Sequence, residues 1–133
     1  MFKYFTPQQA NRMLKDIKAR FERIVSLRDR VFMLQEELQH VVEYDGSLSA
    51  YIIKKQELNK ALTELYKAIE DLEDLGVIVK SIDEGLVDFP AKRFDEDVWL
   101  CWKVGEEEVR FWHGKDEGFM GRKPLPVSDE TLV

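Results

Sequence analysis

The sequence predicts an α+β fold in which a long antiparallel two-helix hairpin precedes a small antiparallel β-meander and an irregular C-terminal segment. Apolar residues recur at alternating steps of three and four up to Gly76, which is the period of a helix. Beyond Gly76 the period changes to two, which is the period of a strand. We therefore expect a single domain over 1–133, with the hairpin at 1–76, the β unit at 77–113 and the C-terminal segment at 114–133.

The first helix begins at a capping signal. Thr6 precedes Pro7, a residue that suits the first helical position, and Gln9 completes a Thr-x-x-Gln capping box. The apolar residues that follow form a narrow seam over about four heptads, a spacing typical of a coiled coil. The seam consists of Met13, Ile17, Phe21, Ile24, Leu27, Val31, Leu34, Leu38 and Val41.

The second helix follows a turn signal at 44–47, and Ser47 or Ser49 can cap it. It ends at Gly76, a suitable C-terminal cap. Two helices of similar length joined by a short turn fold back antiparallel. Their thin apolar stripe predicts a homodimer that buries it as a four-helix bundle. The predicted stripe of the second helix is Leu48, Tyr51, Leu58, Leu62, Leu65, Ile69, Leu72 and Leu75.

The β unit is predicted from short β-rich runs with turn residues between them. The runs are 77–80, 86–89, 98–104 and 109–113, with breaks at 83–85, 90–97 and 105–108. Alternation along the third run gives it two apolar faces. We expect one face to pack on the helices, and the other on the C-terminal segment or a second subunit. Val98, Leu100, Trp102 and Val104 share one of these faces, and Trp99 and Cys101 share the other.

Composition narrows the classes of function. The net charge is -6 and no basic stripe is apparent, so we expect no binding to nucleic acid. The single cysteine cannot form an intrachain disulfide and suits a reducing compartment. The sequence has no apolar run of the roughly 18 residues that a membrane span needs, and no signal-peptide core. A cytoplasmic protein that spans no membrane is the expectation.

Several segments of the second half resemble a prokaryotic family known as domain of unknown function 2203. The resemblance extends over nearly the whole chain, because family members also open with a Thr-Pro helix start and a long charged helical pair. It implies the fold but no activity, catalytic residue or cofactor, since none is assigned to the family. The segments that carry it are Gly85–Pro90, Leu100–Trp102, Gly105–Glu106, Trp112–His113, Gly118–Phe119, Gly121–Arg122 and Pro124–Leu125.

A candidate site is formed by Asp88, His113, Asp116, Glu117 and Arg122, with Cys101 nearby in the sequence. A histidine with several carboxylates can bind a divalent metal or transfer protons. A structural interpretation is stronger, because an aspartate before Phe-Pro is often a turn acceptor and acidic residues in a glycine-flanked loop are often only solvated.

The remaining candidates also have two interpretations. Cys101, in the middle of a run, is expected to be a small buried hydrophobe rather than a nucleophile. Trp99, Trp102 and Trp112 can stack on a planar ligand, but three tryptophans in a small β unit more often form the core. Of these, Trp102 is counted with Glu106 among the candidate ligand contacts. Arg122 can grip an anion, or it can bond internally to Asp88 or Glu106. One histidine and an inert cysteine cannot make the usual three-ligand zinc set unless carboxylates do most of the binding, so we expect no bound metal and no cofactor.

Two hypotheses for function follow. The first is a non-enzymatic protein-interaction or assembly module, which dimerises through its helices and presents the β unit to another protein. His113 is then structural and bonds a carboxylate or a backbone carbonyl. The alternative is a small enzyme or ligand-binding domain, with a site at Asp88, His113, Glu117 and Arg122 where the β unit meets the helices.

Overall fold

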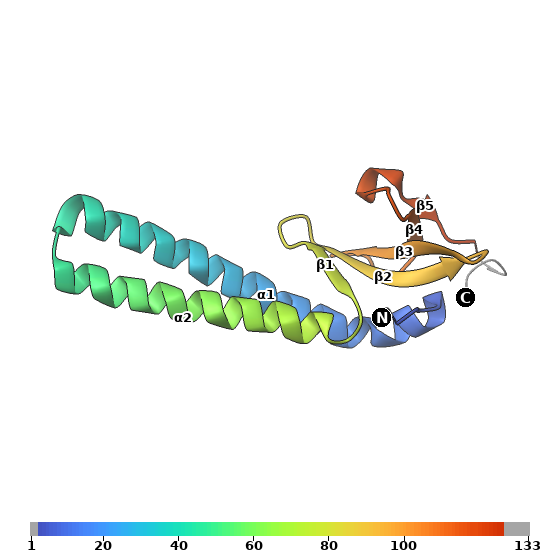
Figure 1. Cartoon of the computed structure of the whole chain (residues 1–133), viewed down its shortest axis with the longest axis horizontal. Coiled ribbons are helices and arrows are strands. Elements are labelled where there is room, and N and C mark those ends of the chain that lie inside the picture. The colour runs from blue at the N-terminus through green and yellow to red at the C-terminus, as the bar shows by residue number, and fades with distance from the viewer. Residues whose placement is uncertain (1–2, 127–133) are drawn as a thin grey trace. The chain divides into compact units, whose positions relative to one another are not determined.

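The structure is a computed structural model that describes residues 3–126. Two long helices precede a five-stranded antiparallel sheet, as the sequence predicts (Figure 1). The described residues form two compact units, one with the residues up to Ala19 and those from Leu72 onward, the other with Arg20–Asp71. The elements are α1 (Pro7–His40), η1 (Val41–Asp45), α2 (Leu48–Glu73), β1 (Ile78–Ser81), β2 (Leu86–Arg93), β3 (Glu96–Lys103), β4 (Phe111–Gly114), η2 (Phe119–Gly121) and β5 (Lys123–Pro124).

The predicted capping box begins α1. The backbone N–H of Thr6 donates to Gln9 Oε1 at 2.9 Å, and the N–H of Gln9 donates to Thr6 Oγ1 at 3.2 Å. These two bonds satisfy backbone donors that have no partner within the helix. The structure therefore confirms both hydrogen bonds of the predicted capping box.

The turn of the hairpin lies close to its predicted position. Here α1 continues into the π-helical turn η1, which Gly46 ends in a left-handed conformation at a φ of 67°. The Ser47 hydroxyl then accepts the backbone N–H of Ala50 at 3.3 Å, so Ser47 caps α2. At the other end of α2, the N–H of Gly76 donates to the carbonyl of Glu73 at 2.9 Å.

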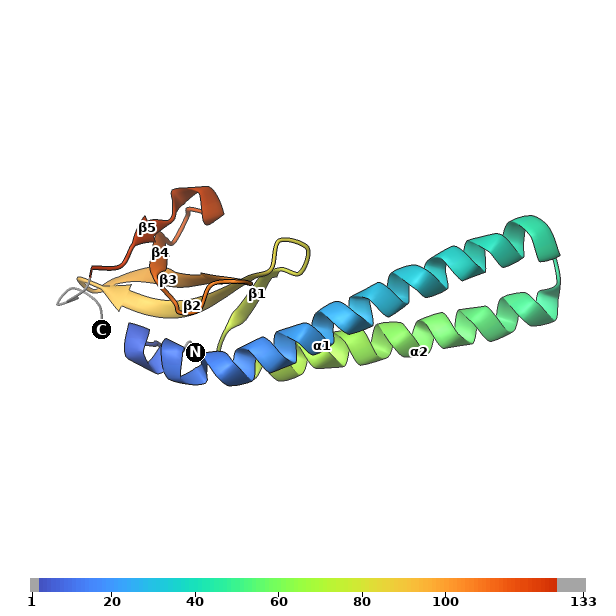
Figure 2. The same cartoon turned by 180° about the vertical axis from the view of Figure 1, so that it is seen from behind.

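The unit Arg20–Asp71 is a helical hairpin, and Figures 1 and 2 show α1 and α2 side by side with opposite directions. The predicted seam of α1 is buried from Ile17 to Leu34, whereas Met13 is only half-buried. On α2 the buried stripe is centred one residue away from the prediction, because the small Ala61 and Ala68 occupy it while Leu62 and Ile69 border it. The buried residues of this unit are Phe21, Ile24, Leu27, Val31, Leu34, Leu58, Ala61, Leu65 and Ala68.

Near the turn the predicted stripe is wrong, since Leu48 and Tyr51 are exposed.

None of the helices within residues 3–126 is long and apolar enough to cross a membrane.

The strands β2 and β3 form a longer hairpin than predicted, and the expected break over 90–97 is wrong. Phe94 and Asp95 make a two-residue turn with φ values of 49° and 64°, the conformation of tight hairpin turns. Pro90 fits within β2 because its carbonyl accepts the N–H of Phe5 at 2.8 Å. The backbone polar groups of Pro90 therefore point away from β3, and its missing N–H removes no bond of the β2–β3 ladder.

The two faces of the sheet have different contents. Buried apolar residues from β2 and β3 fill the face where the ring of Phe89 meets the edge of Phe5 at 5.4 Å. Asp88 and Cys101 lie on the opposite face, because neighbouring residues of a strand alternate. Val104, predicted to continue β3, lies beyond its end and is exposed.

The C-terminal segment is more regular than predicted over its described part. The short helix η2 precedes β5, whose two residues pair with Phe111 and Trp112 of β4. A two-residue pairing is too short to give a periodic signal, so β5 is not predicted, and the rest of the described segment after Gly114 is irregular apart from η2. The prediction for residues 127–133 lies outside the described residues.

Two glycines with positive φ give a matched test of packing at the end of β3. A Cβ at Gly85, whose φ is +71°, would lie 2.8 Å from Val104 Cγ2, whereas a Cβ at Gly105, whose φ is +102°, would meet nothing within 4 Å. Both alanine variants carry backbone strain, but only Gly85→Ala adds a clash. We expect Gly85→Ala to lower the free energy of unfolding by about 1–3 kcal/mol more than Gly105→Ala in urea denaturation. Equal losses would contradict the close approach of Val104.

Candidate functional site

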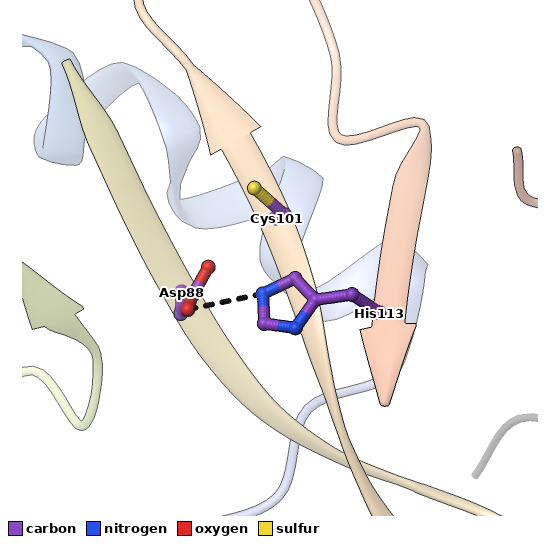
Figure 3. Close-up of side chains that lie close together, drawn as sticks. All are labelled: Asp88, Cys101 and His113. Atoms are coloured by element: carbon purple, nitrogen blue, oxygen red, sulfur yellow. Dashed lines mark hydrogen bonds and ion pairs between the residues drawn. The ribbon is translucent and has the colours of Figure 1, made fainter. Parts of the chain in front are cut away.

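Three chemically active side chains meet on one face of the sheet. Asp88 of β2 lies directly across from Cys101 of β3, and His113 of β4 lies across from Trp99, two residues away on the same face of β3. Figure 3 shows the ring of His113 directed at the carboxylate of Asp88, with the side chain of Cys101 beside them on β3. The carboxylate oxygen, the sulfur and the ring nitrogen lie within 4.8 Å of one another. Pairing of three strands therefore assembles this group, which we call the central cluster.

The central cluster is buried. Asp88 and His113 are each 2% exposed, and Cys101 is 1% exposed. His113 Nε2 lies 3.2 Å from Asp88 Oδ2, and its Nδ1 lies 3.0 Å from the carbonyl oxygen of Gly114. A buried ionisable group without a partner costs several kcal/mol, so this pairing is what allows Asp88 and His113 to occupy the interior.

The two contacts of His113 determine where its protons lie. A carbonyl oxygen only accepts, so Nδ1 must donate to Gly114, and an ionised Asp88 likewise needs a donor at Nε2. Burial opposes the charged ring and lowers the pKa of His113, but the bonds to Asp88 and Gly114 outweigh it, so this pKa lies above its ordinary value of 6.5. The bonds to Asp88 and Gly114 therefore favour the protonated ring of His113 in the chain alone.

The central cluster is unsuited to nucleophilic catalysis by Cys101. Burial, together with the charge of Asp88, raises the pKa of the Cys101 thiol to about 12, so the thiolate is scarce at neutral pH. A catalytic triad also needs the imidazole between nucleophile and carboxylate. Here His113 turns one nitrogen to Asp88 and the other to a backbone carbonyl. The order of groups is therefore not that of a triad.

One oxygen of the central cluster is unsatisfied. Asp88 Oδ1 is buried and has no hydrogen-bond partner, and within residues 3–126 the same holds for Arg122 Nε. An unsatisfied buried polar atom costs about 1–3 kcal/mol. The central cluster therefore has unused capacity to accept a hydrogen bond or coordinate a cation.

Arg122 forms a separate group with Glu106. Its guanidinium bonds the Glu106 carboxylate at 2.5 Å and stacks on the rings of Phe111 and Phe119, at 3.9 and 4.7 Å from the ring centres. The other carboxylate oxygen of Glu106 accepts the backbone N–H of Lys103 at 2.7 Å. Of the two predicted interpretations of Arg122, the structure shows the internal bond to Glu106.

Trp102 belongs to the core. Its side chain is buried, and its indole N–H donates to the backbone carbonyl of Glu106 at 2.9 Å. Trp112 is half-buried, with the cations of Arg93 and Lys123 over its ring. Trp102 therefore has no open face on which a planar ligand could stack.

The two acidic residues of the last loop are exposed. Glu117 accepts the N–H of Gly114 at 2.8 Å and the Nζ of Lys123 at 2.7 Å, and the bond to Lys123 lowers the pKa of Glu117. Asp116 lies beside it on the surface. The structure thus groups Glu117 with Lys123, and Asp88 and His113 with Cys101.

Sequence reasoning missed two features of the central cluster. It gave Cys101 no polar neighbour, and it placed the candidate site where the β unit meets the helices, whereas Asp88 lies on the face opposite Phe89 and Phe5. The signal that bears on this pairing is the turn at Phe94, and it is weak because neither turn residue is glycine. A two-residue turn there sets the register of the hairpin, and counting outward from it places Asp88 across from Cys101.

Substitution of His113 tests the buried pair. His113→Ala leaves Asp88 without its partner, so we expect the free energy of unfolding to fall by about 1–3 kcal/mol, and His113→Asn to recover part of it. The pKa of His113 is raised in the folded state, so protonation of the ring adds to the free energy of unfolding of the wild type but not of His113→Asn. This contribution is fully present below pH 6.5 and is lost as the pH rises through the folded pKa. Denaturation at a series of pH values, with chelator present, measures both effects. An unchanged melting temperature in His113→Ala, or a wild-type advantage over His113→Asn that grows with pH, would contradict this.

Comparison with known proteins gives the family of the chain. Neither the curated proteins nor the solved structures include a match. A family model described as an uncharacterized conserved protein, DUF2203, matches residues 3–125, which span both helices and all five strands. The chain therefore belongs to the DUF2203 family.

Proposed function

We propose that the chain is a non-enzymatic assembly module that dimerises through its helical hairpin. The observation that carries this proposal is an apolar surface beside the buried seam, which the hairpin itself does not cover. We call this surface the apolar flank. It consists of Val25 and Phe32 from α1, and of Leu48, Ile52, Leu62, Tyr66 and Ile69 from α2.

The apolar flank lies on one side of the seam. Phe32 directly follows the buried Val31, and Leu62 and Tyr66 directly follow the buried Ala61 and Leu65. In a helix of 3.6 residues per turn, a residue that follows a seam position is turned about 100° to the same rotational side. Two antiparallel helices direct this side toward the same face of the hairpin, so their contributions form one surface.

The opposite side of the seam carries charged groups that pair within the chain, although Met33, which directly precedes the buried Leu34, is exposed there. Lys54 Nζ lies 2.9 Å from a carboxylate oxygen of Glu37 and 3.3 Å from one of Glu57. The hydrogen bonds to Glu37 and Glu57 raise the pKa of Lys54. Charges on that side pair with one another, whereas the apolar flank keeps large apolar side chains in water, a liability in a protein that acts alone.

A second copy of the chain fits the apolar flank. A two-fold axis places the apolar flank of one copy against that of the other, and the result is a four-helix bundle. From Leu48 to Ile69 the flank extends about 32 Å, and two helices are about 20 Å wide, so each copy offers about 600 Å², near the roughly 800 Å² of a standard interface. The charge of Arg28 beside the flank is paired with Asp29 at 3.1 Å.

Adjacent isoleucines on α2 give a matched test of this dimer. Ile52 belongs to the apolar flank and is 45% exposed, while Ile53 is 55% exposed and lies outside it. We expect wild type and Ile53→Glu to be dimers in light scattering at micromolar concentration. Ile52→Glu buries a charge in the interface and should raise the dissociation constant at least about tenfold.

Two results would contradict the proposal. One is a monomeric wild type at high micromolar concentration. The other is equal weakening by Ile52→Glu and Ile53→Glu, because a dimer through the apolar flank distinguishes these positions. Circular dichroism of both variants verifies that the helices remain folded. Binding of another protein to the β unit stays a prediction.

A further inference from the structure

We propose that Asp88, Cys101 and His113 bind one divalent transition metal ion of the zinc class. The proposal concerns the β unit and does not depend on assembly through the hairpin. It differs from the expectation of no metal, which rested on one histidine and an inert cysteine being too few ligands for zinc. Strand pairing supplies the third ligand that the sequence argument lacked.

The donor set and its spacing suit zinc. Carboxylate oxygen, thiolate sulfur and imidazole nitrogen are its usual ligands, with bonds of about 2.0–2.3 Å, which places neighbouring donors roughly 3.3–3.7 Å apart in a tetrahedron. His113 Nε2 and Asp88 Oδ2 are 3.2 Å apart, and the three donor atoms lie within 4.8 Å of one another.

The orientation of His113 is that of a metal ligand. Histidines that bind metals commonly donate their second ring N–H to a backbone carbonyl or a carboxylate, which fixes the tautomer. His113 Nδ1 makes such a bond to Gly114 at 3.0 Å, and this holds Nε2 toward Asp88. The supporting bond is therefore already present.

The unsatisfied oxygen of Asp88 is an independent observation. Asp88 Oδ1 is buried and has no hydrogen-bond partner, and the Asp88 carboxylate points into the central cluster in Figure 3. A cation coordinated by the Asp88 carboxylate would compensate for this unsatisfied oxygen. No other group of three candidate ligands occurs in the part of the chain that the structure describes.

The charges of the proposed complex balance. The Asp88 carboxylate and the Cys101 thiolate together neutralise a divalent ion, and His113 binds as the neutral imidazole. On binding, the thiol proton of Cys101 and the Nε2 proton of His113 pass to solvent, and the ion takes their place. A neutral complex is the form that a buried site tolerates. A metal ion also deprotonates a coordinated thiol outright.

The burial of the site indicates a structural role. Each ligand comes from a different strand, so the ion would join β2, β3 and β4 at one point. Catalytic zinc sites keep an open position for substrate, whereas these three residues are at most 2% exposed. We therefore expect the ion to stabilise the sheet.

Titration with Co²⁺ tests the proposal on the full chain. Cys101 is the only cysteine, so a thiolate-to-cobalt charge-transfer band can arise from it alone. In chelator-treated protein we expect this band to saturate at one Co²⁺ per chain. Zn²⁺ should then abolish it by displacement. A folded wild type that gives no such band in excess Co²⁺ would overturn the proposal.

Single substitutions assign the ligands. Cys101→Ala should remove the charge-transfer band, while Asp88→Asn and His113→Gln should weaken Zn²⁺ binding by more than about 100-fold, beyond the loss typical of an outer-shell partner. The matched control is His40→Gln, because His40 is the other histidine and lies exposed on α1. It should bind Zn²⁺ as wild type does. Equal weakening by His40→Gln and His113→Gln, or stoichiometric Zn²⁺ in Cys101→Ala, would contradict the assignment.

Discussion

Burial of Asp88 and His113 in the sheet is the constraint on which the β unit depends. Each of these side chains needs the other, because an unpaired ionisable group in the interior costs several kcal/mol. The need fixes the register, since a slip of one residue in β2 would turn Asp88 to the face of Phe89 and away from His113. Cys101 lies on β3, between the strands that carry Asp88 and His113, and is therefore part of the same cluster.

The two compact units satisfy their surfaces in different ways. In the compact unit that contains the sheet, polar groups bond within the chain, as Arg122 does with Glu106 and Glu117 with Lys123. In the hairpin, Lys54 and its partners satisfy one side of the seam, and the other side stays apolar. The unmet requirements are thus an apolar surface in one unit and an unsatisfied carboxylate oxygen in the other. Assembly and metal binding are the separate solutions that we propose for them.

The sequence predicts what is encoded locally. The capping box at Thr6 and the helical period depend on neighbours a few residues apart, and the structure confirms both. The break predicted at Pro90 is wrong. The position of its missing N–H faces away from β3, toward the side of β1, and the pairing of β1 with β2 does not extend to Pro90. The surroundings of Cys101 depend on a register set by non-glycine residues at positive φ, a signal too weak to read without the structure. The small Ala61 and Ala68 of the hairpin seam were overlooked because the prediction followed the larger apolar residues next to them.

The protonation of His113 tests the account most directly, because both the buried pair and the proposed metal site depend on which nitrogen faces Asp88. Nitrogen NMR of the imidazole, with the single exposed His40 as reference, reports this in chelator-treated protein and after one equivalent of Zn²⁺. The account predicts protons on both nitrogens of His113 in mildly acidic, zinc-free protein. After addition of Zn²⁺ it predicts a proton on Nδ1 alone. A ring that keeps its Nε2 proton and lacks the Nδ1 proton would contradict the account.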